Sequence, residues 1–399
     1  MKEVIRISDF PSDKIYVFLN KNYRKELIKN SMNLLNCKNY FELSLWINKK
    51  LKTKFNGGDV KYWVRGKRLD ERTGKVHPKF MSLNTVIGLI KLNNEKIEEL
   101  ERNILSYRSG NRGLRINNPL LPIKVTPELD SIVIHLFGDG AAGDFTPSYT
   151  QKNKSAVDNF IRKMENSFGI FEKSIYFTQG KYQVKFPKAI TDVISEYYKI
   201  DSYNSYKSKI PEKILKRADN KFKLACIVAY ILDEGNIRDV ISLGSVNKEL
   251  INGIRNLVLD CNYKCSNINF NAKSNPYRFT ISVKEIERFF NEIKMLSNQF
   301  PTCNLDFKNE SLNFIIKRRS IKNPKDSKIT NDAIINILKK NDFSAIEISK
   351  FTNYAYCTII HRLQNLLSEN FVTREKQENG VYLWRLNSNY PKFVKEKSM

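Results

Sequence analysis

The chain has 399 residues, of which 41% are hydrophobic and 12% aromatic, a composition typical of a folded protein of several domains and not of a disordered one. Its 68 Lys and Arg residues against 42 Asp and Glu give a net charge of +26, which favours nucleic acid as a partner. A genome-wide bias toward Lys, Asn and Ile is the alternative explanation of this charge. No stretch approaches the roughly 18 apolar residues of a membrane span, and the N-terminus lacks a signal peptide, so we expect a cytoplasmic protein without a membrane segment.

The first section, residues 1–125, is predicted to be mostly helical. An amphipathic helix is expected over residues 40–52, followed by a short helix capped by Asp59 and a further helix over about residues 83–92. Residues 109–127 are rich in Gly, Asn and Pro, and we interpret them as a basic linker.

A basic stretch follows the short second helix of this section. Two helices joined by a glycine-containing turn resemble a helix-turn-helix, and Arg65, Lys67 and Arg68 would then contact DNA. The alternative is a small helical bundle without a binding role.

The middle of the chain contains a repeated motif. Residues 132–140 read IVIHLFGDG and residues 227–235 read IVAYILDEG, so each apolar run ends in an acid followed by glycine. The two acids, Asp139 and Glu234, lie 95 positions apart. We predict that each apolar run is a helix and that the acid lies at its carboxyl end.

The same elements are expected after both motifs. They are a helix, a strand and a second helix, over residues 155–168, 182–186 and 189–198 in the first copy and over residues 248–259, 277–283 and 284–296 in the second. An internal duplication, each half containing helices and strands, explains this pattern.

The physical chemistry of the two acids predicts a metal ion. A carboxylate at the carboxyl end of a helix faces the negative pole of the helix dipole, at a cost of about 0.3–1 kcal/mol. Two such carboxylates would also repel each other if the two helix ends were adjacent. Mg²⁺ (or Mn²⁺) would compensate both effects, since it prefers a few hard oxygen ligands and keeps several waters.

The last section, residues 326–399, follows a second basic linker over residues 317–328. Three helices are predicted over residues 334–338, 345–351 and 357–367, and two strand-like runs flank Asn379-Gly380, a strong hairpin signal. This order resembles a winged helix whose third helix, with His361 and Arg362, would enter the major groove. A small helical cap whose hairpin docks on a neighbouring part is the alternative.

The two motifs resemble the LAGLIDADG motif of homing endonucleases, with both copies on one chain. The resemblance covers about residues 128–320 and implies an α+β fold, a duplicated αββαββα core with saddle-shaped antiparallel sheets that straddle a DNA duplex. We therefore expect three domains, residues 1–125, 126–322 and 326–399, in which small, mostly helical DNA-binding domains flank the core. A monomer with internal pseudo-two-fold symmetry is expected.

The resemblance also implies the site. It maps the catalytic, metal-binding acids to Asp139 and Glu234, and it implies one basic residue near each acid, for which Lys185 and Lys317 are the candidates, the latter after a strand-like run over residues 312–316. The remaining candidates are the motif and helix-packing residues Gly138, Gly140, Ala229 and Gly235, and the DNA-binding residues Tyr182, Tyr277, Arg278, Arg318 and Arg319.

Two motif features carry expectations of their own. Gly140 and Gly235 are expected to adopt the positive φ that ends a helix. Asp233 stands where the first copy has Gly138, and it is interpreted as a cap, a solvent-facing neighbour or a shifted metal ligand.

The function expected from these features is site-specific, metal-dependent hydrolysis of phosphodiester bonds in double-stranded DNA. Two alternatives stay open. One is a transcription regulator that binds DNA on the same scaffold without cutting it, and the other is an RNA-processing or maturase protein.

Overall fold

The computed structural model describes residues 3–70, 74–110, 113–143, 145–238, 240–270, 276–319, 327–377 and 381–387, without the side chains of residues 317–319 and 327–329. The chain divides into two compact units. The first consists of Met1–Asn236 and Ser242–Phe307, and the second of Ile237–Ile241 and Lys308–Met399. The predicted boundaries near residues 125 and 322 stay predictions.

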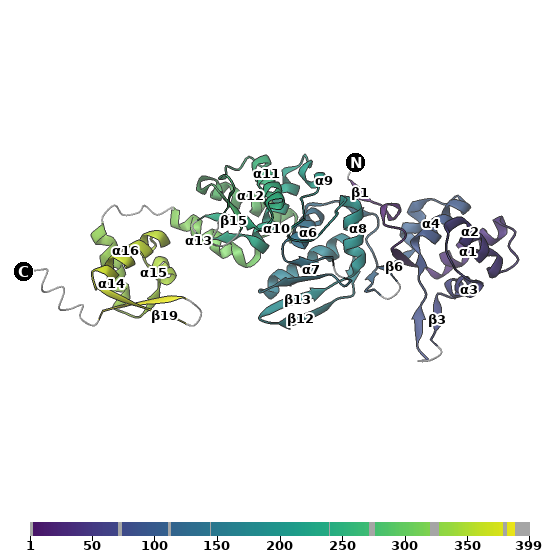
Figure 1. The fold of residues 1–399 in the computed structure, drawn as a ribbon, viewed down its shortest axis with the longest axis horizontal. Coiled ribbons are helices and arrows are strands. Elements are labelled where there is room, and N and C mark those ends of the chain that lie inside the picture. Colours follow the sequence, from purple (N-terminus) through teal and green to yellow (C-terminus); the bar gives the residue numbers. More distant parts are fainter. Residues whose placement is uncertain are drawn as a thin grey trace, which may run out of the picture. The chain divides into compact units, whose positions relative to one another are not determined.

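The N-terminal section combines helices with a five-stranded sheet of order β11-β7-β6-β2-β5 (Figure 1). The helices are α1 (Lys21–Leu34), α2 (Tyr40–Leu51), α3 (Gly57–Arg65), α4 (Leu83–Asn93) and α5 (Ile97–Asn103). The strands are β2 (Ile15–Leu19), β5 (Met81–Ser82), β6 (Ile104–Ser109), β7 (Ile116–Asn117) and β11 (Ile170–Phe171). In β2 alternate side chains, Ile15, Val17 and Leu19, are buried, as expected for a strand with one face on a core. Helices therefore predominate in this section, as predicted, and a sheet that was not predicted accompanies them.

The residue that caps the start of α3 is not the predicted Asp59. The side chain of Asn56 accepts the backbone N–H of Asp59, and the Asp59 carboxylate accepts the N–H of Asn56, which is a capping box. Asn56 is thus the cap, and Asp59 is the third helical residue. After α3 the chain forms a hairpin of β3 (Lys67–Leu69) and β4 (Val76–Pro78).

The prediction of a linker over residues 109–127 was wrong. This segment contains β7, which pairs with β6 and with β11, and β8 (Ile123–Lys124), which pairs with β1 (Val4–Ile5). The Gly, Asn and Pro content is a local signal, whereas these pairings depend on strands distant in the sequence.

The middle of the chain contains two copies of one unit. The first copy consists of α6 (Pro127–Phe137), β9 (Gly140–Ala141), β10 (Ser148–Gln151), α7 (Lys154–Phe168), β12 (Ser174–Thr178), β13 (Lys181–Lys185) and α8 (Lys188–Tyr198). The second, which follows the short α9 (Glu212–Leu215), consists of α10 (Asn220–Glu234), β14 (Asn236–Ile237), β15 (Ile241–Ser245), α11 (Lys248–Asp260), β16 (Asn269–Phe270), β17 (Tyr277–Ile281) and α12 (Ile286–Gln299). The sheets have the orders β12-β13-β10-β9 and β16-β17-β15-β14, so corresponding strands occupy corresponding places. The predicted duplication is confirmed.

The helices that carry the motifs, α6 and α10, pack against each other in the core. Every residue of α6 is buried, and so is α10 from Lys223 to Leu232. Helices surrounded on all sides need apolar residues all round, which explains why both motifs are nearly continuous apolar runs. One detail differs from the prediction, since α6 ends at Phe137 and Asp139 follows the helix instead of ending it.

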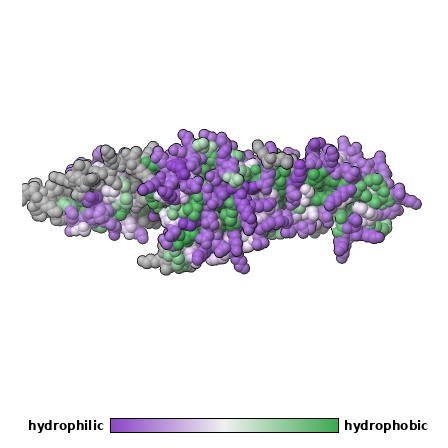
Figure 2. Space-filling model, turned by 90° about the horizontal axis from the view of Figure 1, so that it is seen from above, coloured by the Kyte–Doolittle hydropathy of each residue, from purple (hydrophilic) through white to green (hydrophobic). Residues whose placement is uncertain are grey.

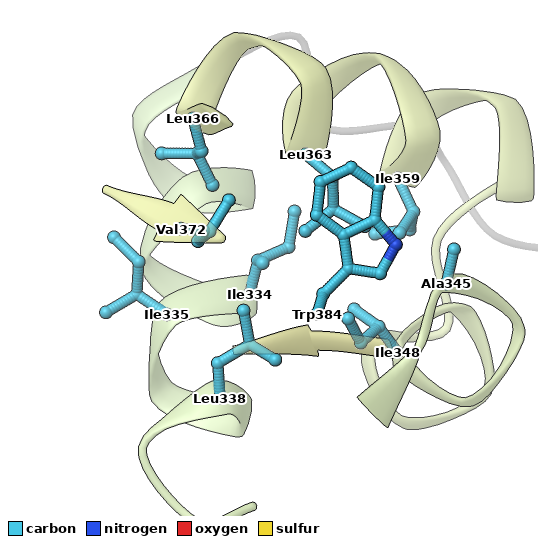
Figure 3. Packing of buried hydrophobic residues seen from close by; sticks show 10 residues of the cluster. All are labelled: Ile334, Ile335, Leu338, Ala345, Ile348, Ile359, Leu363, Leu366, Val372 and Trp384. Carbon is cyan, nitrogen blue, oxygen red and sulfur yellow. The ribbon is translucent and has the colours of Figure 1, made fainter. Parts of the chain in front are cut away.

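The second unit has its own hydrophobic core. Its elements are α13 (Asn309–Arg319), α14 (Ser327–Leu338), β18 (Phe343–Ser344), α15 (Ala345–Thr352), α16 (Tyr356–Ser368), β19 (Val372–Lys376) and β20 (Tyr382–Leu386). In Figure 3 the ring of Trp384, from β20, lies among apolar side chains of the three helices α14 to α16. The predicted helices and strands are present, and β18 adds a third strand to give a sheet of order β18-β20-β19. The interpretation of this unit as a winged helix stays a prediction. The predicted turn Asn379-Gly380 lies outside the described residues.

The strand predicted over residues 312–316 was wrong, because these residues belong to the helix α13. Leu312 and Ile315 are the buried residues there, and a spacing of three fits one face of a helix. Lys317 is therefore near the end of a helix and not of a strand. In the part of the chain that the structure describes, no helix combines the length and the apolar character that a membrane span requires.

Candidate functional site

The ends of α6 and α10 bring the acids of the two motifs to the same end of the helix pair. A Cβ atom placed on Gly138, the C-cap of α6, would lie 2.7 Å from Oδ2 of Asp233 and 2.8 Å from its Cβ. The backbone of Gly138 therefore lies directly against the side chain of Asp233. Asp139 follows this glycine and is half-buried, while Glu234 is the exposed last residue of α10.

The glycines after the acids have a different role from the predicted one. Neither has a positive φ, and Gly235 is extended, with φ −77° and ψ 146°. A Cβ atom on Gly140 would lie 2.6 Å from Cα of Leu136, and one on Gly235 would lie 2.6 Å from the carbonyl oxygen of Ile231. Both glycines are needed because the chain turns closely across the last turn of its own helix. Ala229 is buried within α10.

Asp233 is the centre of a buried polar network. Its side chain is 0% exposed, and the exposed part of the residue is backbone. The carboxylate lies 2.9 Å from Nδ1 of His135, and it accepts hydrogen bonds from the Tyr149 hydroxyl at 2.7 Å and from the Gln151 amide at 3.3 Å. The interpretation of Asp233 as a solvent-facing neighbour was therefore wrong.

A buried lysine completes this network. The ammonium of Lys163, on α7, lies 2.9 Å from Nε2 of His135, and both side chains are nearly inaccessible to water. Because an ammonium only donates, Nε2 must accept, and Nδ1 therefore carries the hydrogen that His135 donates to Asp233. Burial and the charge of Lys163 hold the pKa of His135 well below its ordinary value, which agrees with a neutral imidazole. Lys163 and Asp233 thus form an ion pair bridged by this imidazole.

Gln151 connects the network to the first acid. Its Nε2 donates to Oδ2 of Asp139 at 2.5 Å and also to Asp233, so the two carboxylates are neighbours. Gln151 and Tyr149 are two positions apart on β10, and their side chains therefore leave the strand on the same side. Burial and the Asp233 carboxylate raise the pKa of the Tyr149 hydroxyl, which keeps it a hydrogen-bond donor.

Sequence reasoning missed four members of this site: His135, Tyr149, Gln151 and Lys163. Only His135 carried a signal, as a polar residue inside an apolar helical run. The other three lie on β10 and α7, and no local pattern connects them with the motifs.

The side chains of Asp139 and Glu234 are of the type that binds Mg²⁺ or Mn²⁺. Both offer carboxylate oxygens, and Mg²⁺ uses one or two carboxylates and keeps several waters. Among the described residues there is no group of three or more His, Cys, Asp and Glu side chains that would form a protein cage. Asp233 fits a ligand role poorly, because its buried oxygens already accept hydrogen bonds from other side chains.

The two faces of each sheet differ in chemistry. In the first sheet, Val184 is fully buried on the face toward α7, and alternation places Lys185 on the opposite, accessible face. In the second sheet, Phe279 and Ile281 are buried, and the exposed Arg278 lies on the opposite face. Each sheet therefore presents at least one basic side chain on its open face.

Tyr182 and Tyr277, the two sheet tyrosines predicted to bind DNA, lie on the opposite faces of their strands from Lys185 and Arg278. Tyr182 shares its face with Val184, and Tyr277 shares its face with Phe279. Each pairs with a phenylalanine on the neighbouring strand, with ring centroids 4.7 Å apart for Phe177 and Tyr182, and 5.1 Å apart for Phe270 and Tyr277. The duplication thus extends to one aromatic pair in each hairpin.

The candidates outside the core are mostly at the surface. Arg65, at the end of α3, and Lys67 and Arg68, on β3, are exposed; on α16 His361 is exposed and Arg362 is half-buried. Lys317, Arg318 and Arg319 end α13, and their side chains lie outside the described part of the chain. Figure 2 shows hydrophilic side chains over most of the visible face, with small hydrophobic areas between them.

The chain matches no protein-family model and no curated protein. Among solved structures it is similar to mesophilic variants of the homing endonuclease I-DmoI, at 14% identity over 42% of this chain and 89% of that chain, with a TM-score of 0.33. It is also similar to I-DmoI in complex with DNA and Mn, at 13% identity over 41% of this chain and 95% of that chain, with a TM-score of 0.32. Full-length DUF199/WhiA from Thermatoga maritima is similar at 11% identity over 61% of this chain and 90% of that chain, with a TM-score of 0.32. These similarities are in fold, and they are distant.

Proposed function

We propose that this protein is a site-specific, divalent-metal-dependent endonuclease that hydrolyses phosphodiester bonds in double-stranded DNA. The observation that carries the proposal is the approach of the two motif helices at their carboxyl ends, where Gly138, the neighbour of Asp139, lies against Asp233, the neighbour of Glu234. The net charge of +26 supports a polyanionic substrate. The motif resemblance agrees with this reading.

Asp139 and Glu234 would hold Mg²⁺ or Mn²⁺, one acid beside each scissile phosphate. When bound, the metal supplies Lewis-acid chemistry that lowers the pKa of a water and stabilises negative charge on phosphate oxygens. Other residues of the chain position the two carboxylates. Gln151 orients the carboxylate of Asp139 through its hydrogen bond, and the packed helix ends set the separation of the two acids.

The open faces of the sheets would contact the duplex. Lys185 and Arg278 lie on these faces, where Arg can read guanine in the major groove and Lys can neutralise phosphate. Lys185 is also our candidate for stabilising charge in the transition state, with Lys317 as the candidate for the second half. Tyr182 and Tyr277 would contact DNA only at the rims of the sheets, since they share the faces of buried residues.

The flanking parts would extend the contact along the DNA. We propose that α3 and its hairpin, with Arg65, Lys67 and Arg68, bind the backbone. The winged helix would place α16, with His361 and Arg362, in the major groove. Arg318 and Arg319 would add phosphate contacts. The protein would act as a monomer, because the duplication supplies both halves of the site.

The test is cleavage of a randomised duplex library in Mg²⁺ or Mn²⁺, with sequencing of the ends. Defined ends that disappear in Asp139→Asn and in Glu234→Gln support the proposal. Asp158→Asn is the matched control, since Asp158 is an exposed acid on α7 that pairs with Lys154. Specific binding without ends, at any metal concentration, would identify a non-catalytic regulator, and a preference for RNA over the same DNA sequence would favour an RNA-processing role.

A further inference from the structure

Asp233 is a buried acid that precedes Glu234 in the chain and shares the amide of Gln151 with Asp139. We propose that Asp233 is a positioning residue that fixes the amide of Gln151 and, through it, the carboxylate of Asp139. Hydrolysis at the Asp139 half of the site would then depend on Asp233 more strongly than hydrolysis at the Glu234 half. This inference rests on the proposed function for its consequence, but the positioning itself is measurable without cleavage.

The side-chain amide of Gln151 is shared by the carboxylates of Asp139 and Asp233. The NH₂ group of Gln151 has two hydrogens, and its nitrogen lies 2.5 Å from Oδ2 of Asp139 and 3.3 Å from Oδ1 of Asp233. An amide with one acceptor can turn about its terminal torsion, whereas an amide between two carboxylates has its plane and its flip state fixed. Asp233 therefore determines how Gln151 meets Asp139.

Asp233 is itself held in place by buried partners. Its carboxylate is completely buried and is held by the Tyr149 hydroxyl and the His135 imidazole. Tyr149 in turn stacks on Phe160, with ring centroids 4.1 Å apart. A buried carboxylate is costly unless it is paired, and Lys163 provides the opposite charge through His135. Side chains from α6 and β10 thus converge on the Asp233 carboxylate, and α7 contributes Lys163 behind His135.

The two copies have different residues at the positions of Gln151 and Asp233. Matching Asn153-Lys154 with Asn247-Lys248, at the starts of α7 and α11, places Ser245 opposite Gln151. The hydroxyl of Ser245 accepts the backbone N–H of Asn247 at 3.0 Å and has no amide to offer. Gly138, which has no side chain, occupies the place of Asp233 in the first copy, so the first copy has no counterpart of the Asp233 carboxylate. The two halves are therefore chemically unequal.

A purely structural role is the competing explanation, in which the network only holds the helices together. Such a role would lower stability and affect both halves of the site alike. The matched control is Asp130, on α6, whose buried carboxylate accepts from Arg217 at 2.8 Å and from the Tyr198 hydroxyl. Asp130→Asn perturbs a buried acid of the same kind at the opposite end of the helix.

The kinetic test compares both strands of one duplex, each carrying its own label, under single-turnover conditions. Asp233→Asn is expected to slow the cut on one strand by about tenfold relative to the other, since the amide of Gln151 would then donate to a neutral amide oxygen instead of a charged carboxylate. Tyr149→Phe, which keeps the ring stack and should fold even if Asp233→Asn does not, is expected to change the ratio in the same direction. Asp130→Asn should leave the ratio of the two rates unchanged. Equal slowing of both strands by the Asp233 and Tyr149 variants would overturn the proposal.

A spectroscopic test separates the positioning from the cleavage. In protein labelled with ¹⁵N-glutamine, the side-chain amide signals of Gln151 should shift in Asp233→Asn and in Tyr149→Phe, and not in Asp130→Asn. Unchanged Gln151 signals in both variants would refute the positioning role. If the signals shift but the wild-type protein cuts no DNA in any metal, the proposed function fails and the positioning of Asp139 stands.

Discussion

Gly138→Ala is expected to destabilise the first unit, because the added methyl group has no room. Its carbon would lie 2.7 Å from Oδ2 and 2.8 Å from Cβ of Asp233, distances that real Cβ atoms do not show. Asp233 is held by buried partners and cannot turn away, so the helices must separate. Overpacking of this kind costs about 1–3 kcal/mol. The lower entropy of the unfolded chain with alanine returns about 0.4–1 kcal/mol.

A net loss of about 1–2 kcal/mol therefore follows for Gly138→Ala, measured as the shift of the urea unfolding midpoint by far-UV circular dichroism. Gly143→Ala is the control, since a Cβ atom there would meet nothing within 4 Å. The control should be as stable as the wild type or slightly more stable. The reasoning is refuted if Gly138→Ala and Gly143→Ala unfold at the same urea concentration, because the two helix ends would then not be in contact.

Further predictions concern the second unit, the buried histidine and DNA binding. Trp384→Ala should destabilise the second unit by about 3–5 kcal/mol in calorimetry and leave the first unit unchanged, because its side chain is only 2% exposed. The pKa of His135 is well below the ordinary 6.5 in the folded state, so the imidazole stays neutral there, whereas in the unfolded chain it takes up a proton below about pH 6.5. The free energy of unfolding should therefore fall as the pH drops below about 6.5. In a pH series of urea midpoints, His135→Gln should flatten this part of the curve. Lys185→Ala and Arg278→Ala should each reduce the salt dependence of DNA affinity by about one unit of log–log slope in fluorescence anisotropy, and an unchanged slope would exclude phosphate contact by that residue. Deletion of residues 326–399 should weaken binding and flatten the salt slope further, and an identical slope would contradict DNA binding by the winged helix.

The sequence predicted the parts of the fold that depend on local pattern. Two apolar runs that end in acid and glycine, each followed by the same elements, were sufficient to predict the duplicated unit. A run such as residues 312–316 was ambiguous, because a short apolar stretch fits a strand or one face of a helix. Strand β7 was missed because its partners β6 and β11 are what make it a strand. The role of Asp233 was not predictable, since His135 and Tyr149 lie 98 and 84 positions away in the sequence.

The contact between Asp233 and His135 also determines which halves can associate. Two copies of the second half, placed together in the same way, would bring one Asp233 carboxylate against another at a buried helix crossing, where like charges repel. Two copies of the first half would place Gly138 against Gly138 and leave Lys163 and His135 without their carboxylate. Only one first half with one second half pairs the buried charges and fills the space at the helix crossing. The two different halves should therefore associate specifically with each other. A chain split between residues 199 and 211 should therefore reassemble from its two different fragments and not from two identical ones.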